Sequence, residues 1–145
     1  MRMWPQAAEL HHALLQTLVA LCKDNSMMKA HITVTACPTL RASLTAHAAS
    51  GAVADRGFTL LGVLQSGGDH LNDGVRRLLA EAQLLKTATA GLRAHAAGDE
   101  GALTAVCFSV AMLLRGAAPW RETVKWQAAR SGVLDALAYA SEVCS

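Results

Sequence analysis

Six histidines and four cysteines are the residues of this chain best suited to hold a metal ion or to act as nucleophiles. The histidines stand at positions 11, 12, 31, 47, 70 and 95. No pair has the H-x-x-x-H or H-E-x-x-H spacing that turns two imidazoles toward one ion. The cysteines are Cys22, Cys37, Cys107 and Cys144. They are widely spaced and form no C-x-x-C pair, so the sequence predicts no metal site and no disulfide framework, only small buried side chains in a reducing compartment.

Catalytic motifs are missing as well. The sequence contains no G-x-S-x-G and no glycine-rich phosphate loop after a strand, and its acidic residues are scattered. Cys107 stands inside an apolar run, where a thiol is expected to be inert. We therefore expect a non-enzymatic protein without catalytic residues, cofactor or small-molecule substrate.

Basic residues are the next candidates. The net charge is +2, and the densest basic group consists of Arg76, Arg77, Lys86 and Arg93. No aromatic residues interleave with this group, as they do in many nucleic-acid-binding surfaces. The sequence favours a solvated helix face, and a small helical regulator or nucleic-acid-associated protein using these four residues is the alternative function.

Two tryptophans near the C-terminus are candidates for an interface. Trp120 and Trp126 stand six residues apart with Arg121 beside the first, and Trp and Arg are enriched at interface hot spots. We expect Trp126 to fill the core where an earlier segment has Arg77 and Leu78. Trp120 and Arg121 are then left as candidate partner-binding residues.

The elements that must position these residues are set by an internal self-match. The segment 43–49 returns as 91–97, an offset of 48 residues, and Gly74-Val-Arg-Arg returns as Thr123-Val-Lys-Trp with an offset of 49. Phe58 returns as Phe108, and His47 as His95 near the ends of equivalent helices. Such a period is typical of stacked copies of one supersecondary unit.

Apolar spacing and punctuation predict an all-α chain in groups of three helices. Helices are expected at 6–23, 27–35, 38–50, 53–66, 70–82, 83–97, 100–115, 120–130 and 132–144. Ser26 and Asp99 are expected N-caps, and Pro38 and Pro119 are expected in first helical turns. The 145 residues, 52% of them hydrophobic, suffice for a single domain at 1–145. No apolar stretch reaches the roughly 18 residues of a membrane-spanning helix, so we expect no membrane partner.

Several segments resemble armadillo repeats. Gly132-Val-Leu-Asp-Ala-Leu137, preceded by Ala128-Ala-Arg-Ser131, is similar to the opening of the family's second helix. The segment 91–99 is similar to the turn that leads into the third helix, and 105–113 to the third helix itself. The resemblance implies a short right-handed α-solenoid of three-helix units. The partial units are 6–23 and 119–145, and the full units are 26–66 and 70–115. HEAT-like helix pairs and a compact helical bundle are the alternatives.

The resemblance also implies a groove lined by third helices. The family's peptide-binding Trp positions correspond to Leu15, Phe58 and Phe108. Its Asn positions correspond to Val19, Gly62 and Met112, so the amides that hold a peptide backbone are absent, and binding of basic nuclear-localisation peptides does not carry over. Phe58, Phe108 and Met112 instead favour a partner helix or apolar segment, or else belong to the core.

The sequence thus predicts an interaction scaffold or subunit that docks another protein, or another copy of itself, through its groove or its uncapped ends. Val133–Val143 is expected to form an alanine-rich last helix, with no obvious third helix to cover it. The cytoplasm is the expected location, with nucleus, cilium and mitochondrion left open.

Overall fold

The computed structural model describes residues 7–67, 69–81, 83–115 and 120–143, with only the backbone described for residues 69–72 and 120. These residues form eight α-helices and no strand. The helices are α1 (Ala7–Cys22), α2 (Ser26–Ala46), α3 (Gly51–Gln65), α4 (Asp69–Glu81), α5 (Leu84–His95), α6 (Glu100–Leu114), α7 (Trp120–Ser131) and α8 (Val133–Val143). The all-α prediction is confirmed. Two differences concern α2: it is not interrupted before Pro38, and it ends at Ala46, four residues before the expected end at 50. The other expected helix ends are displaced by at most two residues.

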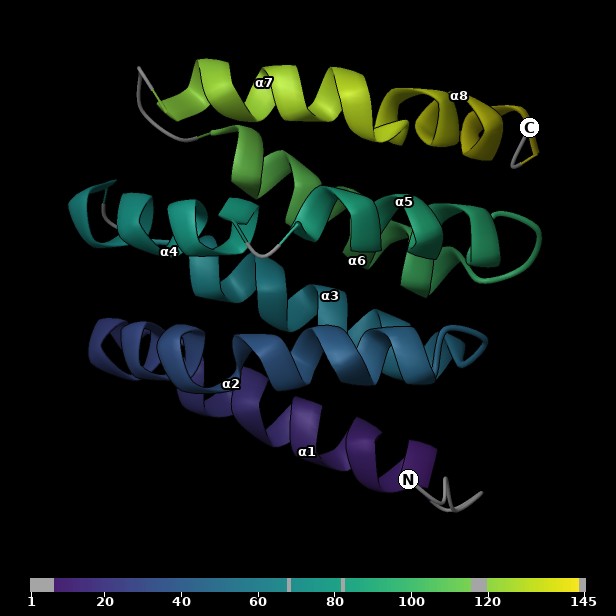
Figure 1. Ribbon diagram of the computed structural model, residues 1–145. Coiled ribbons are helices and arrows are strands. Elements are labelled where there is room, and N and C mark those ends of the chain that lie inside the picture. The colour runs from purple at the N-terminus through teal and green to yellow at the C-terminus, as the bar shows by residue number, and fades with distance from the viewer. Residues whose placement is uncertain (1–6, 68, 82, 116–119, 144–145) are drawn as a thin grey trace.

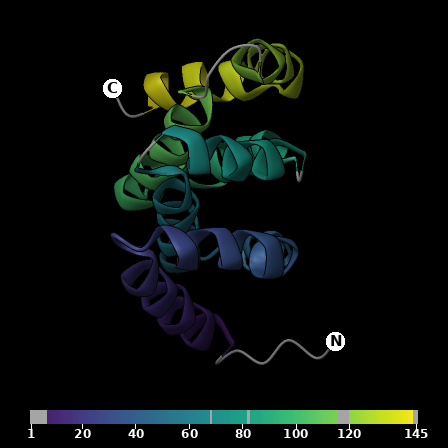
Figure 2. The same cartoon turned by 90° about the vertical axis from the view of Figure 1, so that its left-hand side faces the viewer.

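The helices are arranged in two adjoining columns. One column contains α1, α3 and α6, and the other contains α2, then α4 and α5 end to end, then α7 and α8 end to end (Figures 1 and 2). Helix α3 contacts α6 and α1 most extensively, while α5 contacts α8 and α2 contacts α4. Among the described residues, the first and last layers therefore each have a neighbouring layer on one side only.

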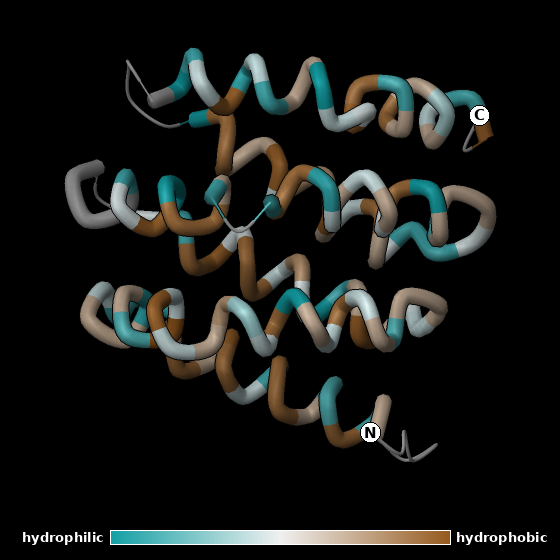
Figure 3. Tube along the Cα trace, in the orientation of Figure 1, coloured by the Kyte–Doolittle hydropathy of each residue, from teal (hydrophilic) through white to brown (hydrophobic). Residues whose placement is uncertain are grey.

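The core lies where the two columns meet, and hydrophobic residues follow α3 and α6 through the middle of the molecule (Figure 3). The largest fully buried apolar side chains include Leu60 and Leu64 of α3, Leu92 of α5 and Leu113 of α6. None of the helices in the described part of the chain is long and apolar enough to span a membrane.

Side-chain caps fix the starts of three helices. The Asn25 Oδ1 accepts the N–H of Met28 at 3.0 Å, the Ser50 Oγ accepts that of Val53, and the Asp99 Oδ1 accepts that of Ala102 at 2.9 Å. Each acceptor satisfies one of the amides that have no partner in a helix's first turn. Asp99 is the N-cap that the sequence predicted. Ser26 is not, because the preceding Asn25 has the extended backbone and the side chain that reaches the helix.

Helix α2 corrects the prediction for Pro38. Instead of starting a helix, Pro38 lies inside one that runs unbroken from Ser26 to Ala46. A proline at this point removes one N–H donor, which would have met the carbonyl of Val34. Val34 is exposed, so water can satisfy that carbonyl, while buried Ile32 and Leu40 hold the helix on both sides of the proline.

Two parts of the chain correspond at a constant offset of 49 residues. Helices α3 and α6 each have 15 residues, and their N-caps are Ser50 and Asp99 (99 − 50 = 49). The junctions before α5 and α8 contain Gln83 and Gly132 (132 − 83 = 49), with φ values of 60° and 77°. At this offset the counterpart of Phe58 is Cys107 rather than Phe108, which corrects the predicted pairing of the two phenylalanines.

Candidate functional site

A groove with a volume near 720 Å³ lies between α6 and α8. Its wall on α6 comprises Glu100, Leu103, Thr104, Cys107, Phe108 and Ala111, and its wall on α8 comprises Leu137, Ala140 and Ser141. Residues on α6 spaced three and four apart share one face of the helix, which is why 100, 104, 107 and 111 meet in the groove. The lining is mainly apolar and includes the small side chains of Ala111 and Ala140.

Phe108 lies at the rim of this groove and is 39% exposed. Its ring lies against Gly62 of α3, where a Cβ would overlap the ring atoms. Phe108 also lines a second hollow of about 410 Å³ between α3 and α6, which contains Asp55, Thr59 and Thr104. The glycine at 62 is therefore what lets the Phe108 ring approach α3 so closely, at a point where the ring lines both hollows.

The other two predicted groove residues are in the core. Phe58 is 2% exposed, and it lies close to Gly91 of α5 and to Val106 of α6. Met112 is also buried. Neither Phe58 nor Met112 can contact a partner in this conformation. Of the three predicted residues, Phe108 is the one that lines the groove. Cys107 and Ala111 were missed as surface residues, although an offset of 49 instead of 50 would have placed them there.

The C-terminal prediction is wrong for Trp126, which is 67% exposed. Arg77, its counterpart 49 residues earlier, is itself exposed, so that position has no core to fill. The Arg130 guanidinium carbon lies 6.0 Å from the centre of the Trp126 ring, at the edge of cation–π range. Arg121 is exposed, with its Nε 3.8 Å from Glu122 Oε1. The side chain of Trp120 lies outside the described residues.

Arg76 does not belong to a basic surface. Its guanidinium is buried, and it donates hydrogen bonds to the carbonyl oxygens of Gln65 and Met112, each at 3.1 Å. It also pairs with Asp73 at 3.2 Å. Those carbonyls belong to the last turns of α3 and α6, where a positive charge meets the negative ends of both helix dipoles.

The other predicted basic residues remain exposed. Arg77 pairs with Glu81 at 2.9 Å, and Lys86 and Arg93 stand on α5. With Arg76 buried between helices, these residues do not make up the four-residue basic face that the alternative function requires.

The histidines differ in their surroundings. His11 Nδ1 lies 2.5 Å from Ser43 Oγ, and its ring centre lies 4.7 Å from that of His47, so these side chains join α1 to α2. His95 is buried, and its Nε2 has no hydrogen-bond partner. Across the described residues, no three histidine, cysteine or acidic side chains lie close enough together to hold a metal ion.

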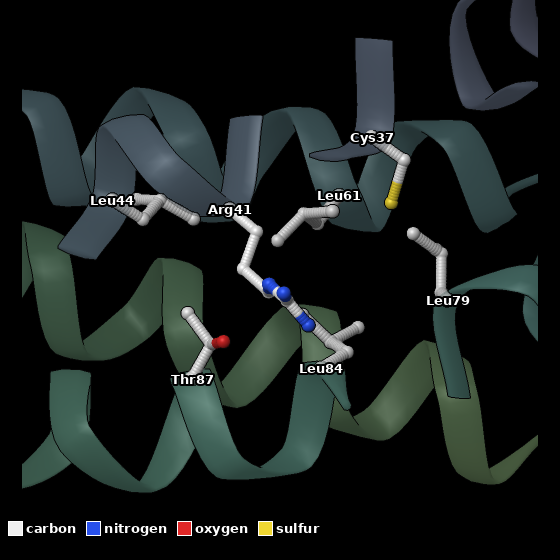
Figure 4. Close-up of a pocket in the computed structure, with 7 residues that line it drawn as sticks. All are labelled: Cys37, Arg41, Leu44, Leu61, Leu79, Leu84 and Thr87. Atoms are coloured by element: carbon white, nitrogen blue, oxygen red, sulfur yellow. The ribbon is translucent and has the colours of Figure 1, made fainter. Parts of the chain in front are cut away.

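A small, partly open cavity lies between α2, α3, α4 and α5 (Figure 4). Its volume is near 10 Å³, about the space of a single water molecule. Leucines from all four helices line it, and the Arg41 side chain lies across it from α2 toward Leu84 and Thr87 (Figure 4). We interpret this cavity as a packing gap without room for a ligand.

Two of the cysteines, Cys22 and Cys37, are buried and have thiols of low reactivity. Burial raises the pKa of the Cys22 thiol, an effect that the charge of Lys29 partly offsets. Burial likewise raises the pKa of Cys37, with Arg41 acting in the opposite direction. Both thiols therefore remain protonated near neutral pH, whereas Cys107 is exposed in the groove.

Exposed large hydrophobic side chains concentrate at the two ends of the molecule. The first layer, α1 and α2, exposes Leu10, Leu14, Leu21, Met27 and Val34. The last layer, α7 and α8, exposes Trp126, Leu134, Tyr139 and Val143. Between them, Leu78 and Phe108 are the only others in the described part of the chain.

The described structure thus exposes apolar side chains in both end layers and an apolar groove between α6 and α8. Comparison with known proteins adds no identity, because no protein family, curated protein or solved structure is detectably similar to this chain.

Proposed function

We propose that this chain is a non-enzymatic interaction scaffold, built as a short solenoid of armadillo-like three-helix units, that holds a helix of another protein in the groove between α6 and α8. The constant offset of 49 residues between the caps of α3 and α6, and between the junctions before α5 and α8, supports the repeated unit. The apolar lining of the groove supports a helical occupant.

The position of the groove is the observation that carries the proposal. On α3, Asp55 and Gly62 face α6, since Asp55 lies near Gly101 and Gly62 lies against Phe108. Their counterparts on α6 are Thr104 and Ala111, and both line the groove. The groove is thus the place where a further third helix would lie against α6.

The energetics favour an occupant that covers more than this groove. Burial of one large apolar side chain contributes about 1.5–3 kcal/mol, so three anchors give roughly 5–9 kcal/mol. Association costs an estimated 4–15 kcal/mol in lost motion and ordering. A helix in the groove alone therefore binds weakly, and stable binding needs contacts with the exposed side chains of α7 and α8 as well.

Photo-crosslinking tests this function. A photoreactive amino acid at Ala111, in the groove, is expected to form a discrete adduct with a bound protein. The same amino acid at Ala94, which is exposed on α5 and lines none of the hollows described above, is the matched control. The variant Ala111→Arg fills the groove with a charged side chain and should abolish retention of that protein, while Ala94→Arg should not. Equal retention by the two arginine variants would contradict the proposal.

A further inference from the structure

We infer that the helix that occupies the α6–α8 groove is α1 of a second copy of this chain, so that copies join head to tail. The inference rests on the proposed function, because it names the occupant of the same groove. It follows from which residues each end of the molecule leaves exposed.

Helix α1 is the counterpart of α3 and α6. It begins the column that those two helices continue, and it packs on α3 as α3 packs on α6 (Figure 2). Aligning the last residues of α1 and α3 gives an offset of 43 (65 − 22 = 43), which pairs buried Leu15 with buried Phe58 and buried Cys22 with buried Gln65. The face of α1 that meets α3 is therefore the face that α3 turns toward α6.

The opposite face of α1 is open and apolar. Leu10, Leu14 and Leu21 are 60%, 54% and 49% exposed. Their counterparts on α3 are Val53, Gly57 and Leu64, and all three are buried. At the corresponding positions α6 buries Ala102, Val106 and Leu113. Leucine thus occupies positions on α1 that are buried in both other helices of the column, and no described helix lies on that side of α1.

At the other end of the molecule, α8 exposes positions that are buried in its counterpart α5. Leu85 of α5 is 4% exposed, whereas its counterpart Leu134 on α8 is 57% exposed. Leu92 is fully buried, whereas its counterpart Ser141 is exposed and lines the groove. Helix α5 is covered by α8, and nothing in the described chain covers α8 in the same way.

The two open ends are complementary parts of one unit. Helices α7 and α8 correspond to α4 and α5, which the chain follows with α6, and α1 corresponds to α6. When α1 of a second copy lies in the groove, it completes on α7 and α8 the three-helix arrangement that α4, α5 and α6 form. Helix α2 of that copy then stacks on α7 and α8, which supplies the additional contacts that the groove alone lacks.

A basic residue in each first helix supports the same assembly. The Lys29 Nζ of α2 donates to the Ser66 carbonyl at the end of α3, at 2.6 Å, and Arg76 of α4 donates to the Met112 carbonyl near the end of α6. Lys125 of α7 stands 49 residues after Arg76 and is exposed. The last turn of α1 has no basic residue of its own. In the head-to-tail assembly Lys125 approaches the carboxyl end of the neighbour's α1, where a cation is favoured.

This contact joins two different surfaces, so it does not close on itself as a twofold dimer does. Each copy retains one free α1 and one free groove, and the assembly grows as the protein concentration rises. Light scattering after size exclusion should show a mass that increases with concentration. Modification of Cys107 by a maleimide, measured on its own peptide, should slow over the same range, because the groove becomes occupied.

Two single variants make the test specific. Leu14→Arg alters the α1 face and leaves the groove intact, while Ala111→Arg fills the groove and leaves α1 intact. Both positions are exposed, so the fold should survive, as circular dichroism and thermal melting will show. Each variant alone is expected to be monomeric. An equimolar mixture should form a dimer of one copy of each that grows no further, since only one complementary pair of faces remains. Ala94→Arg should assemble like the unaltered chain.

A chain that stays monomeric up to millimolar concentration overturns the inference, as does a mixture of the two variants that remains monomeric. If the chain is monomeric but Ala111 still crosslinks a different protein, the proposed function stands and only the second copy is excluded as the occupant. If Ala111 crosslinks nothing and the chain is monomeric, both fail.

Discussion

At the scale of single residues, Arg76 does the most to connect the layers. Its guanidinium reaches the ends of α3 and α6 at once and also pairs with Asp73. Buried hydrogen bonds to a charged group contribute more than neutral ones, about 1.5–3 kcal/mol. The guanidinium is fixed at two carbonyls and a carboxylate, so its contribution is to stability rather than to a binding surface.

We expect Arg76→Ala to lower the free energy of unfolding by about 2–4 kcal/mol, because it removes the guanidinium that donates to the buried carbonyl of Gln65 and to that of Met112, which also accepts the N–H of Arg115. Urea denaturation measures the loss. The adjacent exposed Arg77 is the matched control, and Arg77→Ala should change stability by no more than about 0.5 kcal/mol. Arg76→Lys should lie between, since a lysine keeps the charge but cannot span both carbonyls. Equal losses at 76 and 77 would refute this role.

The sequence alone could not separate these two arginines. Both fall in the self-match of 74–77 with 123–126, and that match shows only that the positions correspond, not which of them point inward. The same limit explains Trp126, whose counterpart Arg77 is exposed. Burial at these positions depends on which helices neighbour the first helix of a unit, and this is a tertiary property.

At the scale of elements, most helices could be predicted from the sequence, because loop residues and caps such as Asp99 mark where one apolar helical segment ends and the next begins. The prediction failed at Pro38, where a local rule for proline conflicted with burial on both sides. In α4 and α5 the corresponding region is broken at Gln83, which has a positive φ. Residues 26–46 therefore form one continuous helix where the later region forms two, α4 and α5, and only the burial of Ile32 and Leu40 reveals this.

Replacement of the proline tests whether the continuous α2 carries strain. Pro38→Ala restores an N–H donor for the Val34 carbonyl and removes the clash of the proline ring with the preceding turn. We expect the free energy of unfolding to rise by about 1–3 kcal/mol. Thr39→Ala, at the next exposed position, corrects for helix propensity and should contribute no more than about 0.5 kcal/mol. A loss of stability on Pro38→Ala would mean instead that the proline sets a bend that the packing of α2 on α3 requires.

At the scale of the whole molecule, the two columns distribute stability unevenly. Helix α3 has neighbours on both sides, α1 and α6, whereas α1 and α8 each have a covered face and an open one. In stacked architectures stability is close to a sum of contributions from each unit and from its contacts with neighbours. The ends should therefore open at a lower free energy than the middle.

Native-state hydrogen exchange, measured on dilute Ala111→Arg so that copies do not associate, should resolve this gradient. Amides of α3 and α6 are expected to exchange only through global unfolding, while those of α1 and α8 exchange through local opening and are faster. The unaltered chain at high concentration should gain protection in α1 and α8 but not in α3, because only the terminal layers acquire a new neighbour there.

Equal protection of α1 and α3 in the dilute variant would contradict the uneven distribution of stability. A gain confined to α8 would show that the groove was occupied without using the α1 of a neighbour. Because the two ends report separately, the experiment tests the distribution of stability within one copy and the joining of copies as independent results.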